Sequence, residues 1–184
     1  VADMFNSQLP QIKGAMFHVE TRAAGENSAP VTIIQSEYMR RMKELSRIES
    51  GMQFYGQMPD EYTIILNSDH RLIKEIREDG DKATAEKLKP VDADIKGLEA
   101  RRAVLSQEQE KKKADELTDE DRKQMKDCEE QIGKRREERK GILAEYAKDN
   151  KTLHQLVDLA LLQNNMLRGE ALSKFISRSI DMIK

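Results

Sequence analysis

Cysteine is almost missing from this sequence, and a disulfide-stabilised fold is thereby excluded. Cys128 is the only cysteine among 184 residues, so no intrachain disulfide can form and a reducing compartment is expected. A run of eighteen apolar residues is also missing, so the sequence predicts no membrane-spanning helix, and no signal peptide opens the chain. Because the sequence begins at Val1 rather than at a methionine, we expect it to be a fragment of a longer protein.

An excess of charge of one sign is missing as well. The chain has 32 Lys and Arg residues against 34 Asp and Glu residues, which gives a formal net charge of −2 at pH 7. Such a balance provides no broad attraction to phosphate backbones or to anionic membranes. We therefore expect neither nucleic acid nor a membrane as a partner.

Catalytic and metal-binding patterns are the third absence. His18, His70 and His154 are far apart in the sequence, and no His or Cys cluster has the spacing of a metal site. Neither a P-loop nor a dinucleotide-binding glycine motif is present. His70 is predicted to cap a helix or to be structural, and Cys128 to be a small packing residue. The chain itself is therefore predicted not to be an enzyme and to hold no cofactor or metal.

Charge is abundant, since 36% of residues are charged and only 4% are aromatic. Between residues 101 and 140, 25 of 40 residues are charged, 13 basic and 12 acidic. Seam positions around this segment recur at alternating spacings of three and four, which predicts an antiparallel helical hairpin over about 91–148. Its tip is expected near Lys111–Thr118, with Thr118 capping the second helix. The seam positions are Val91, Ile95, Leu98, Arg102 and Leu105, then Met125, Cys128, Ile132, Arg135, Arg139, Ile142 and Tyr146.

Residues 17–77 predict a small unit of sheet and helix. Alternating or β-branched residues at 17–21, 31–34 and 62–66 predict three short strands. Ser36 and Asp69 are predicted to cap the two helices that follow the second and third strands. The predicted fold class is α+β, a three-stranded sheet with packed helices and an inserted hairpin. The first of these helices is expected to carry an apolar stripe of Tyr38, Met39, Met42, Leu45 and Ile48.

Residues 150–184 predict two helices that are too apolar to remain uncovered. The first is apolar almost all round, and the second carries a full apolar face from which Arg178 and Asp181 are excluded. A sheet of three short strands cannot cover both. We therefore expect the two helices to form a bundle with a second copy of the chain, in a two-fold dimer. The predicted interface residues are Leu156, Leu159, Leu162, Leu172, Phe175, Ile176, Ile180 and Ile183.

Several strings of the sequence resemble the ninety-kilodalton heat-shock chaperones, and the bacterial form most of all. One string, 66–73, is similar to the family's strand-to-helix segment with Asn, Pro, Asp and His, although Ser68 stands where the family has proline. The others resemble the family's Met-bearing amphipathic helix, the apolar loop after it and two terminal helices. The resemblance covers about residues 17–77 and 150–184, in the same order as in the family. The other strings are 36–43, 51–56, 158–162 and 175–178.

This resemblance implies a C-terminal domain that joins two protomers of a cytoplasmic, bacterial, ATP-driven chaperone that assists protein folding. ATP and Mg²⁺ would be bound by a separate N-terminal domain, to which nothing in this sequence corresponds. The full-length parent would then be an ATPase, whereas this fragment would not. One departure is large, because about 55 extra residues, the charged hairpin, stand between the helix at Ile76 and the helix at Leu153.

A second functional surface is implied by the methionines around the apolar loop. Methionine suits contacts with many partners because its thioether chain is flexible and polarisable, although each one could equally be an ordinary core residue. Their clustering, together with the resemblance, favours contact with unfolded or partly folded client proteins. The predicted client-binding residues are Met39, Met42, Met52, Phe54, Tyr55 and Met58.

The charged hairpin has three possible roles: a solvated spacer, a protein-docking arm or an RNA-binding arm. Basic clusters at 111–113 and 134–136 are interleaved with acidic residues, and no aromatic side chain is available for stacking on bases, so RNA binding is disfavoured. A salt-bridged, solvated hairpin is the default interpretation. The alternative for the whole chain is a scaffold or adaptor protein that acts through this coiled-coil arm.

Overall fold

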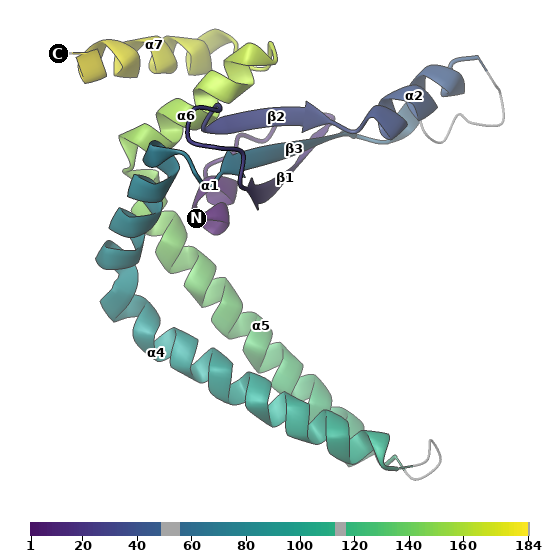
Figure 1. Ribbon diagram of the computed structural model, residues 1–184. Coiled ribbons are helices and arrows are strands. Elements are labelled where there is room, and N and C mark those ends of the chain that lie inside the picture. The colour runs from purple at the N-terminus through teal and green to yellow at the C-terminus, as the bar shows by residue number, and fades with distance from the viewer. Residues whose placement is uncertain (49–55, 113–116, 184) are drawn as a thin grey trace. The chain divides into compact units, whose positions relative to one another are not determined.

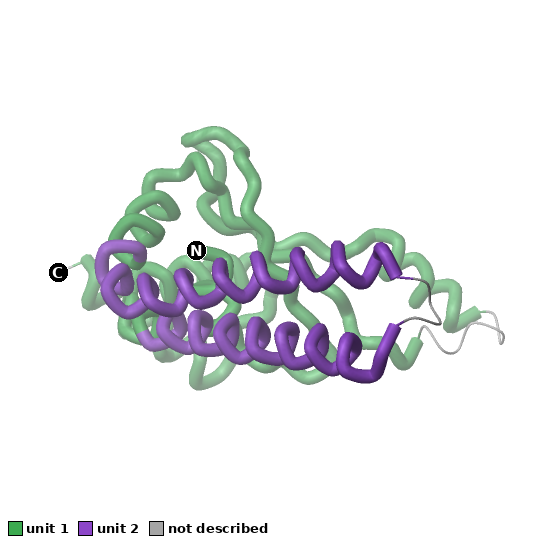
Figure 2. The backbone as a smooth tube through the Cα atoms, turned by 90° about the horizontal axis from the view of Figure 1, so that it is seen from below, with its two compact units in different colours: residues 1–80, 146–184 green, residues 81–145 purple. Residues whose placement is uncertain are grey.

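A computed structural model of the chain describes residues 1–48, 56–112 and 117–183. It divides into two units, drawn in green and purple in Figure 2. Unit 1 comprises residues 1–80 and 146–184, and unit 2 comprises residues 81–145. Among the described residues, no helix combines the length and the apolar character that crossing a membrane would require.

Unit 1 is built on the predicted three-stranded sheet (Figure 1). Its strands are β1 (Ala15–Arg22), β2 (Val31–Gln35) and β3 (Asp60–Asn67), in the order β1-β3-β2. The central strand, β3, runs parallel to β1 and antiparallel to β2. β3 therefore forms hydrogen bonds with both outer strands, and the sheet is mixed.

One face of the sheet carries the core of unit 1. Val19, Ile64 and Ile33 form a row across the three strands, and the neighbouring row holds Leu66 and Val31. Alternation of side chains along each strand places these apolar residues on the same face. Ile64 and Leu66 are 1% and 0% exposed.

Helices α1 (Ala2–Ser7) and α6 (Lys151–Gln163) contact this sheet, α1 at β1 and α6 at β2. Met4 and Phe5 of α1 are fully buried. The sequence analysis made no prediction for α1. Six residues are too few for a helix to be stable by propensity, so burial of these two side chains accounts for it.

Helix α2 (Glu37–Ser46) follows β2 and lies beyond the end of that strand in Figure 1. The predicted cap is confirmed, because the Ser36 side chain accepts a hydrogen bond from the Met39 N–H. An ion pair between Lys43 Nζ and Asp60 Oδ1, at 2.8 Å, connects α2 to the sheet.

The predicted cap at Asp69 is wrong, because His70 caps the following helix. His70 Nδ1 accepts from the Leu72 N–H at 3.2 Å, and its carbonyl accepts from Ile73 and Lys74. The Asp69 carboxylate instead accepts from the N–H of Gly25 at 2.8 Å. The local sequence pattern predicted that the Asp69 side chain would cap α4, but this side chain bonds to Gly25, which lies 44 residues away in the sequence.

The helix that follows, α4 (Arg71–Glu110), continues for 40 residues from unit 1 into unit 2. The sequence suggested two helices here, yet Pro90 lies inside a continuous one. Proline removes one helical hydrogen bond and commonly costs about 3 kcal/mol in a helix interior. Leu88 and Val91 on either side are buried, at 7% and 4% exposed, so packing holds the helix together around the proline.

In unit 2, α4 pairs antiparallel with α5 (Asp119–Lys148), as predicted. Ion pairs connect the helices, among them Arg135–Asp94 and Arg139–Asp92 at 3.0 Å and Arg136–Glu99 at 2.7 Å. From Arg135 to Arg139 the residue number rises along α5, while that of the paired acid falls from Asp94 to Asp92 along α4. Opposite directions of this kind are expected of an antiparallel hairpin. Two arginines in the predicted apolar seam are thus satisfied by acids of the opposite arm.

The tip of the hairpin has the predicted cap. Thr118 Oγ1 accepts from the Asp121 N–H at 3.1 Å, and Asp121 Oδ2 accepts from the Thr118 N–H at 3.0 Å, which is a reciprocal capping box. Lys112 Nζ also contacts the Asp121 carboxylate at 2.8 Å. These bonds lower the pKa of Asp121 to about 2, with the Lys112 hydrogen bond as the largest cause.

The predicted seam is correct in its centre and wrong at two places. Cys128 and Ile132 are 2% and 3% exposed, and the Cys128 thiol lies 3.4 Å from the carbonyl oxygen of Leu98, as expected of a packing residue. Arg102, however, is exposed, and Leu143 is buried in place of Ile142. A straight α-helix turns every 3.6 residues, so its buried face drifts away from an ideal heptad.

Candidate association and client-binding surfaces

Helix α6 is apolar on two sides, and the structure covers only one of them. Asn150 caps it by accepting from the Leu153 N–H at 2.9 Å. Leu159 and Leu162, both in the predicted interface, remain 43% and 37% exposed. Leu156, also in that prediction, is 6% exposed within a single chain and offers little surface to a partner. The other buried residues of α6 are Leu153, Val157, Ala160 and Leu161.

Helix α7 (Gly169–Ile183) has no buried residue at all, although one side of it is apolar. Ile176, Ile180 and Ile183 are 49%, 51% and 85% exposed. Leu172 and Phe175 are half-buried. Met182, which the sequence analysis did not select, adds to the same exposed surface at 47%. Sequence patterning predicted that this helix needs a cover, and the described residues of this chain cover its apolar side only in part.

Polar groups connect α7 to α6. The Arg178 guanidinium donates to Asp158 Oδ2 at 2.5 Å and to Gln155 Oε1 at 2.9 Å. Gln155 Nε2 donates to Ser179 Oγ at 2.6 Å. Sequence analysis placed Arg178 off the apolar face but gave it no role, and it missed the other three residues. The sequence did contain one signal for this network, because Gln155 and Asp158 are polar residues three positions apart on the otherwise apolar helix α6.

The predicted client surface is described in part. Met39 and Met42 of α2 are half-buried, and so is Met58. Met52, Phe54 and Tyr55 lie outside the described residues. The structure therefore brings Met39 and Met42 together on α2 and leaves the contribution of the loop residues as a prediction.

Within the predicted apolar stripe, the described residues other than the two methionines are the more exposed ones. Tyr38, Leu45 and Ile48 are 61%, 40% and 81% exposed. The spacing of seven residues places Tyr38 and Leu45 on one side of α2, and Ile48 follows just after the helix ends. Elsewhere on α2, Arg41 pairs with Glu37 at 2.5 Å and Arg40 with Glu44 at 2.9 Å. The helix is thus amphipathic, with an open apolar stripe and a salt-bridged charged surface.

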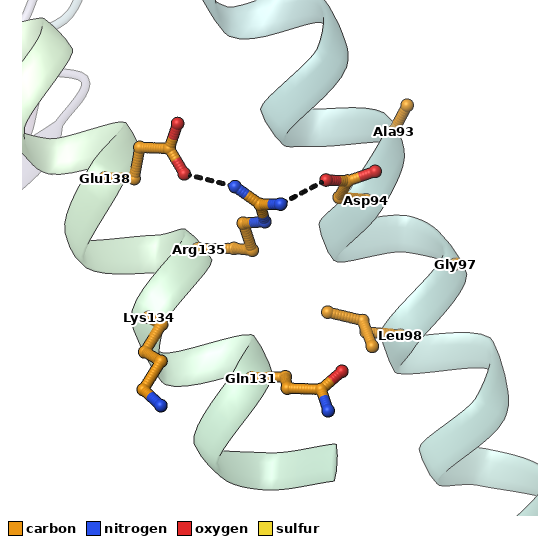
Figure 3. A pocket seen from close by; sticks show the side chains of 8 residues that line it. All are labelled: Ala93, Asp94, Gly97, Leu98, Gln131, Lys134, Arg135 and Glu138. Atoms are coloured by element: carbon orange, nitrogen blue, oxygen red, sulfur yellow. Dashed lines mark hydrogen bonds and ion pairs between the residues drawn. The ribbon is translucent and has the colours of Figure 1, made fainter. Parts of the chain in front are cut away.

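A groove of about 600 Å³ lies between the arms of unit 2 (Figure 3). Arg135 lies across it and bonds to Asp94 at 3.0 Å and to Glu138 at 2.6 Å. These bonds raise the pKa of Arg135, with the Glu138 hydrogen bond as the largest cause. The other lining residues are Ala93, Gly97, Leu98, Gln131 and Lys134.

The basic cluster at this groove is neutralised by the chain itself. Lys134 pairs with Glu130 at 2.7 Å, and Arg136 pairs with Glu99 at the same distance. Arg135 is held by two carboxylates, as described above. Phosphate binding depends on cations that are free to replace counterions, so these three residues offer little to RNA.

The histidines occupy structural positions rather than a shared site. His18 is exposed on β1, His70 is the cap of α4, and His154 Nε2 bonds with the carbonyl oxygen of Lys148 at 2.9 Å. Within the described ranges, no group of three or more His, Cys, Asp or Glu side chains could hold a metal ion.

Comparison with known proteins gives relatives over nearly the whole chain. The chain is 45% identical over 179 residues to the chaperone protein HtpG of Bacteroides fragilis, and 43% identical over 183 residues to that of Bacteroides thetaiotaomicron. It is 34% identical over 176 residues to the HtpG of Porphyromonas gingivalis. These alignments cover 97%, 100% and 96% of this chain.

The chain spans only about a quarter of the length of these relatives, 26% for the first and third and 27% for the second. No protein-family model matches the chain. No solved structure matches it either. The alignment with the Bacteroides thetaiotaomicron relative covers the whole chain and so includes residues 81–145, which the resemblance noted in the sequence did not cover. Identities of this size over almost every residue place the chain in the HtpG family of bacterial chaperone proteins, consistent with a C-terminal fragment.

Proposed function

We propose that the chain joins two protomers of an ATP-dependent chaperone by associating with a second copy of itself through α6 and α7. The observation that carries this proposal is α7, a 15-residue amphipathic helix with no buried residue. Apolar surface of this kind gains about 25 cal/mol for each Å² removed from water. A helix that keeps its apolar side uncovered in its own chain is therefore expected to be covered by another.

A second copy is the simplest cover. Two-fold packing brings the same surface of both chains together, so the exposed residues of α6 and α7 would face their own counterparts. Four helices packed in this way can reach the ~2,000 Å² typical of an obligate dimer. The proposed interface consists of Leu159, Leu162, Leu172, Phe175, Ile176, Ile180, Met182 and Ile183.

The position of the interface is tested by the double variant Ile176→Asp, Ile180→Asp. Two carboxylates buried between the copies would lose their hydration without a partner, so the variant is expected to be monomeric at tens of micromolar. Val104→Asp is the matched control, because Val104 is an equally exposed apolar residue, at 55%, on a helix of unit 2. The control should keep the mass of the unmodified chain, and equal masses for all three proteins would contradict the proposed interface.

The second part of the proposal is that α2 contacts unfolded or partly folded client proteins. Support comes from the open stripe of Tyr38, Leu45 and Ile48, with Met39 and Met42 beside it. Flexible and aromatic apolar side chains can adapt to segments of differing shape. The loop residues Met52, Phe54 and Tyr55 and the half-buried Met58 remain proposed contacts.

Client contact is tested by protection of an aggregating protein. A Met42→Ser, Phe54→Ser variant and a Tyr38→Ser, Ile48→Ser variant should both protect less well than the unmodified chain. Arg40→Gln, Arg41→Gln is the control, since these residues carry the charged surface of the same helix. Full protection by both serine variants, each shown to be folded, would contradict the assignment.

The parent protein would supply everything catalytic. We infer from the resemblance to the chaperone family that ATP and Mg²⁺ are bound by an N-terminal domain of the parent, and this chain spans only 26% of the length of an HtpG relative. The fragment itself is then non-catalytic, and a bacterial cytoplasm is the proposed location. Dimerisation would couple the two ATPase arms of the parent.

A scaffold or adaptor acting through unit 2 is the second candidate, favoured by the length of the hairpin and by its open groove. The two candidates differ in what unit 2 contributes. Tyr146 Cε1 would lie 3.1 Å from a Cβ at Gly80, so the two ends of unit 1 are neighbours that a short Gly-Ser linker can join. Replacing residues 81–145 by such a linker should leave self-association and client protection intact. Loss of both self-association and client protection would favour the hypothesis that the chain is a scaffold or adaptor acting through unit 2.

A further inference from the structure

The attachment of α7 to α6 depends on polar groups to an unusual degree. None of the fifteen residues of α7 is buried, so apolar packing alone gives it little hold on α6. The Arg178–Asp158 ion pair between the two helices is largely enclosed, with side chains only 18% and 21% exposed. An ion pair shielded in this way is screened less by solvent than an exposed surface pair.

The geometry of these bonds restricts two motions at once. The Arg178 Nε and Nη2 atoms reach Gln155 and Asp158, which lie one turn apart on α6. A planar guanidinium with two fixed partners opposes both sliding and rotation of α7 along α6. Gln155 also donates to Ser179 Oγ, and that hydroxyl donates to the Phe175 carbonyl at 2.8 Å. The network is therefore satisfied within one chain.

The network lies beside the exposed leucines of α6. Leu159 is four residues after Gln155, and Leu162 is four residues after Asp158, so all four share one side of the helix. A second chain packed on Leu159 and Leu162 would also cover these polar groups. Polar groups removed from water in this way fix the register of helices because a shifted arrangement would leave them unpaired.

We propose that Gln155, Asp158, Arg178 and Ser179 position α7 on α6 within each chain, so that the apolar surface for the second copy exists before the two chains meet. This inference rests on the self-association proposed above. Arg178 and Asp158 are positioning residues in this account, because the apolar contacts with the partner are made by their neighbours.

The first test compares dissociation constants of the dimer by sedimentation at graded concentrations. Asp158→Asn and Arg178→Gln should each raise the dissociation constant roughly 10- to 100-fold, because each leaves a charged or polar partner unpaired at a surface that becomes buried. The double variant should cost much less than the product of the two single effects, since both remove the same contact. Lys174→Gln is the matched control: Lys174 pairs with Glu170 on α7 at 2.7 Å, but the side chains are 71% and 82% exposed. An unchanged dissociation constant in both single variants would overturn the proposal.

The second test measures amide hydrogen exchange of α7 in single chains, using the Ile176→Asp, Ile180→Asp background. Adding Arg178→Gln should speed exchange in α7 and leave the amides of β3 unchanged, whereas Lys174→Gln should alter neither. If the unmodified chain proves to be a monomer, the proposed self-association fails, and amide exchange in α7 alone decides whether the network positions the helix.

Equal amide exchange of α7 in the Arg178→Gln and Lys174→Gln proteins would overturn the proposal that the network positions α7. If Arg178→Gln speeds exchange in α7 as expected but leaves the dissociation constant of the dimer unchanged, the network positions α7 without contributing to association, and that part of the proposal is overturned.

Discussion

At the residue scale, the string that resembles the chaperone family proves to be a structural connection. Asn67 is 1% exposed, and its side-chain oxygen accepts from the N–H groups of Ala24 and Asp69 at 3.1 Å. Its side-chain nitrogen donates to the Gly25 carbonyl at 2.8 Å. The carboxylate of Asp69 then accepts from the Gly25 N–H. Together, Asn67 and Asp69 tie the β1–β2 loop to the start of α4.

We predict that Asn67→Ala lowers the free energy of unfolding by about 2–3 kcal/mol, because several backbone groups lose their partner in a buried place. Urea unfolding followed by circular dichroism measures the change. Asn27→Ala, in the same loop but exposed, should stay within about 0.5 kcal/mol of the unmodified chain. A loss below 0.5 kcal/mol for Asn67→Ala would show that the loop finds other partners.

A second residue-scale prediction concerns pH. The folded-state pKa of Asp121 is about 2, below its ordinary value of 3.8, because Lys112 and Thr118 bond to its carboxylate. A group with a lowered folded pKa stabilises the fold above its unfolded pKa, and that contribution is lost as pH falls from about 4 towards 2. The carboxyl carbon of Asp121 should therefore titrate near pH 2 by NMR. Lys112→Gln should move the midpoint upward, and a midpoint near 4 in the unmodified chain would refute the hairpin-tip geometry.

Caps show how far sequence reasoning reaches at this scale. Ser36 and Thr118 were predicted correctly because the groups that they bond lie within three residues. Asp69 was not, because its partner lies in a distant loop. Arg178 was left without a role for the same reason, since Asp158 is 20 residues away and only the turn between α6 and α7 brings them together.

At the scale of elements, periodicity gave the three strands, α2, the hairpin and the terminal helices with nearly correct limits. It failed where tertiary packing decides. Helix α1 is held by the burial of Met4 and Phe5, and α4 passes through Pro90 because Leu88 and Val91 are packed. Gly169, the first residue of α7, has φ 58°, a conformation that glycine adopts without strain.

Helical glycines provide a prediction at this scale. Gly133 is exposed in α5, and a Cβ there would meet nothing within 4 Å, so Gly133→Ala should raise the stability of unit 2 by up to about 1 kcal/mol. Gly80 in α4 is the contrasting case, because a Cβ would overlap the terminal methyl of the buried Met4. Gly80→Ala should therefore destabilise unit 1, by about 1–3 kcal/mol for an overpacked core. Thermal unfolding compares the two, and equal shifts in the same direction would contradict the packing at Gly80.

At the scale of the whole molecule, the chain is one unit of sheet and helix with a long charged hairpin inserted in it. The sequence indicated this organisation through a change of composition, because a charged segment with heptad spacing cannot belong to the core of a small sheet. It could not show which apolar side chains each unit leaves uncovered. That depends on burial, and burial separates Leu156, inside the chain, from Leu159 and Leu162 on its surface.

The central claim is that α7 completes its burial against a second copy of the chain. Sedimentation equilibrium of the unmodified chain, from below one micromolar to tens of micromolar, tests it most directly. The account predicts a mass near twice 21.2 kDa at the upper concentrations, with amide exchange in α7 slowing as the dimer forms. A mass that stays near 21.2 kDa at every concentration would contradict it.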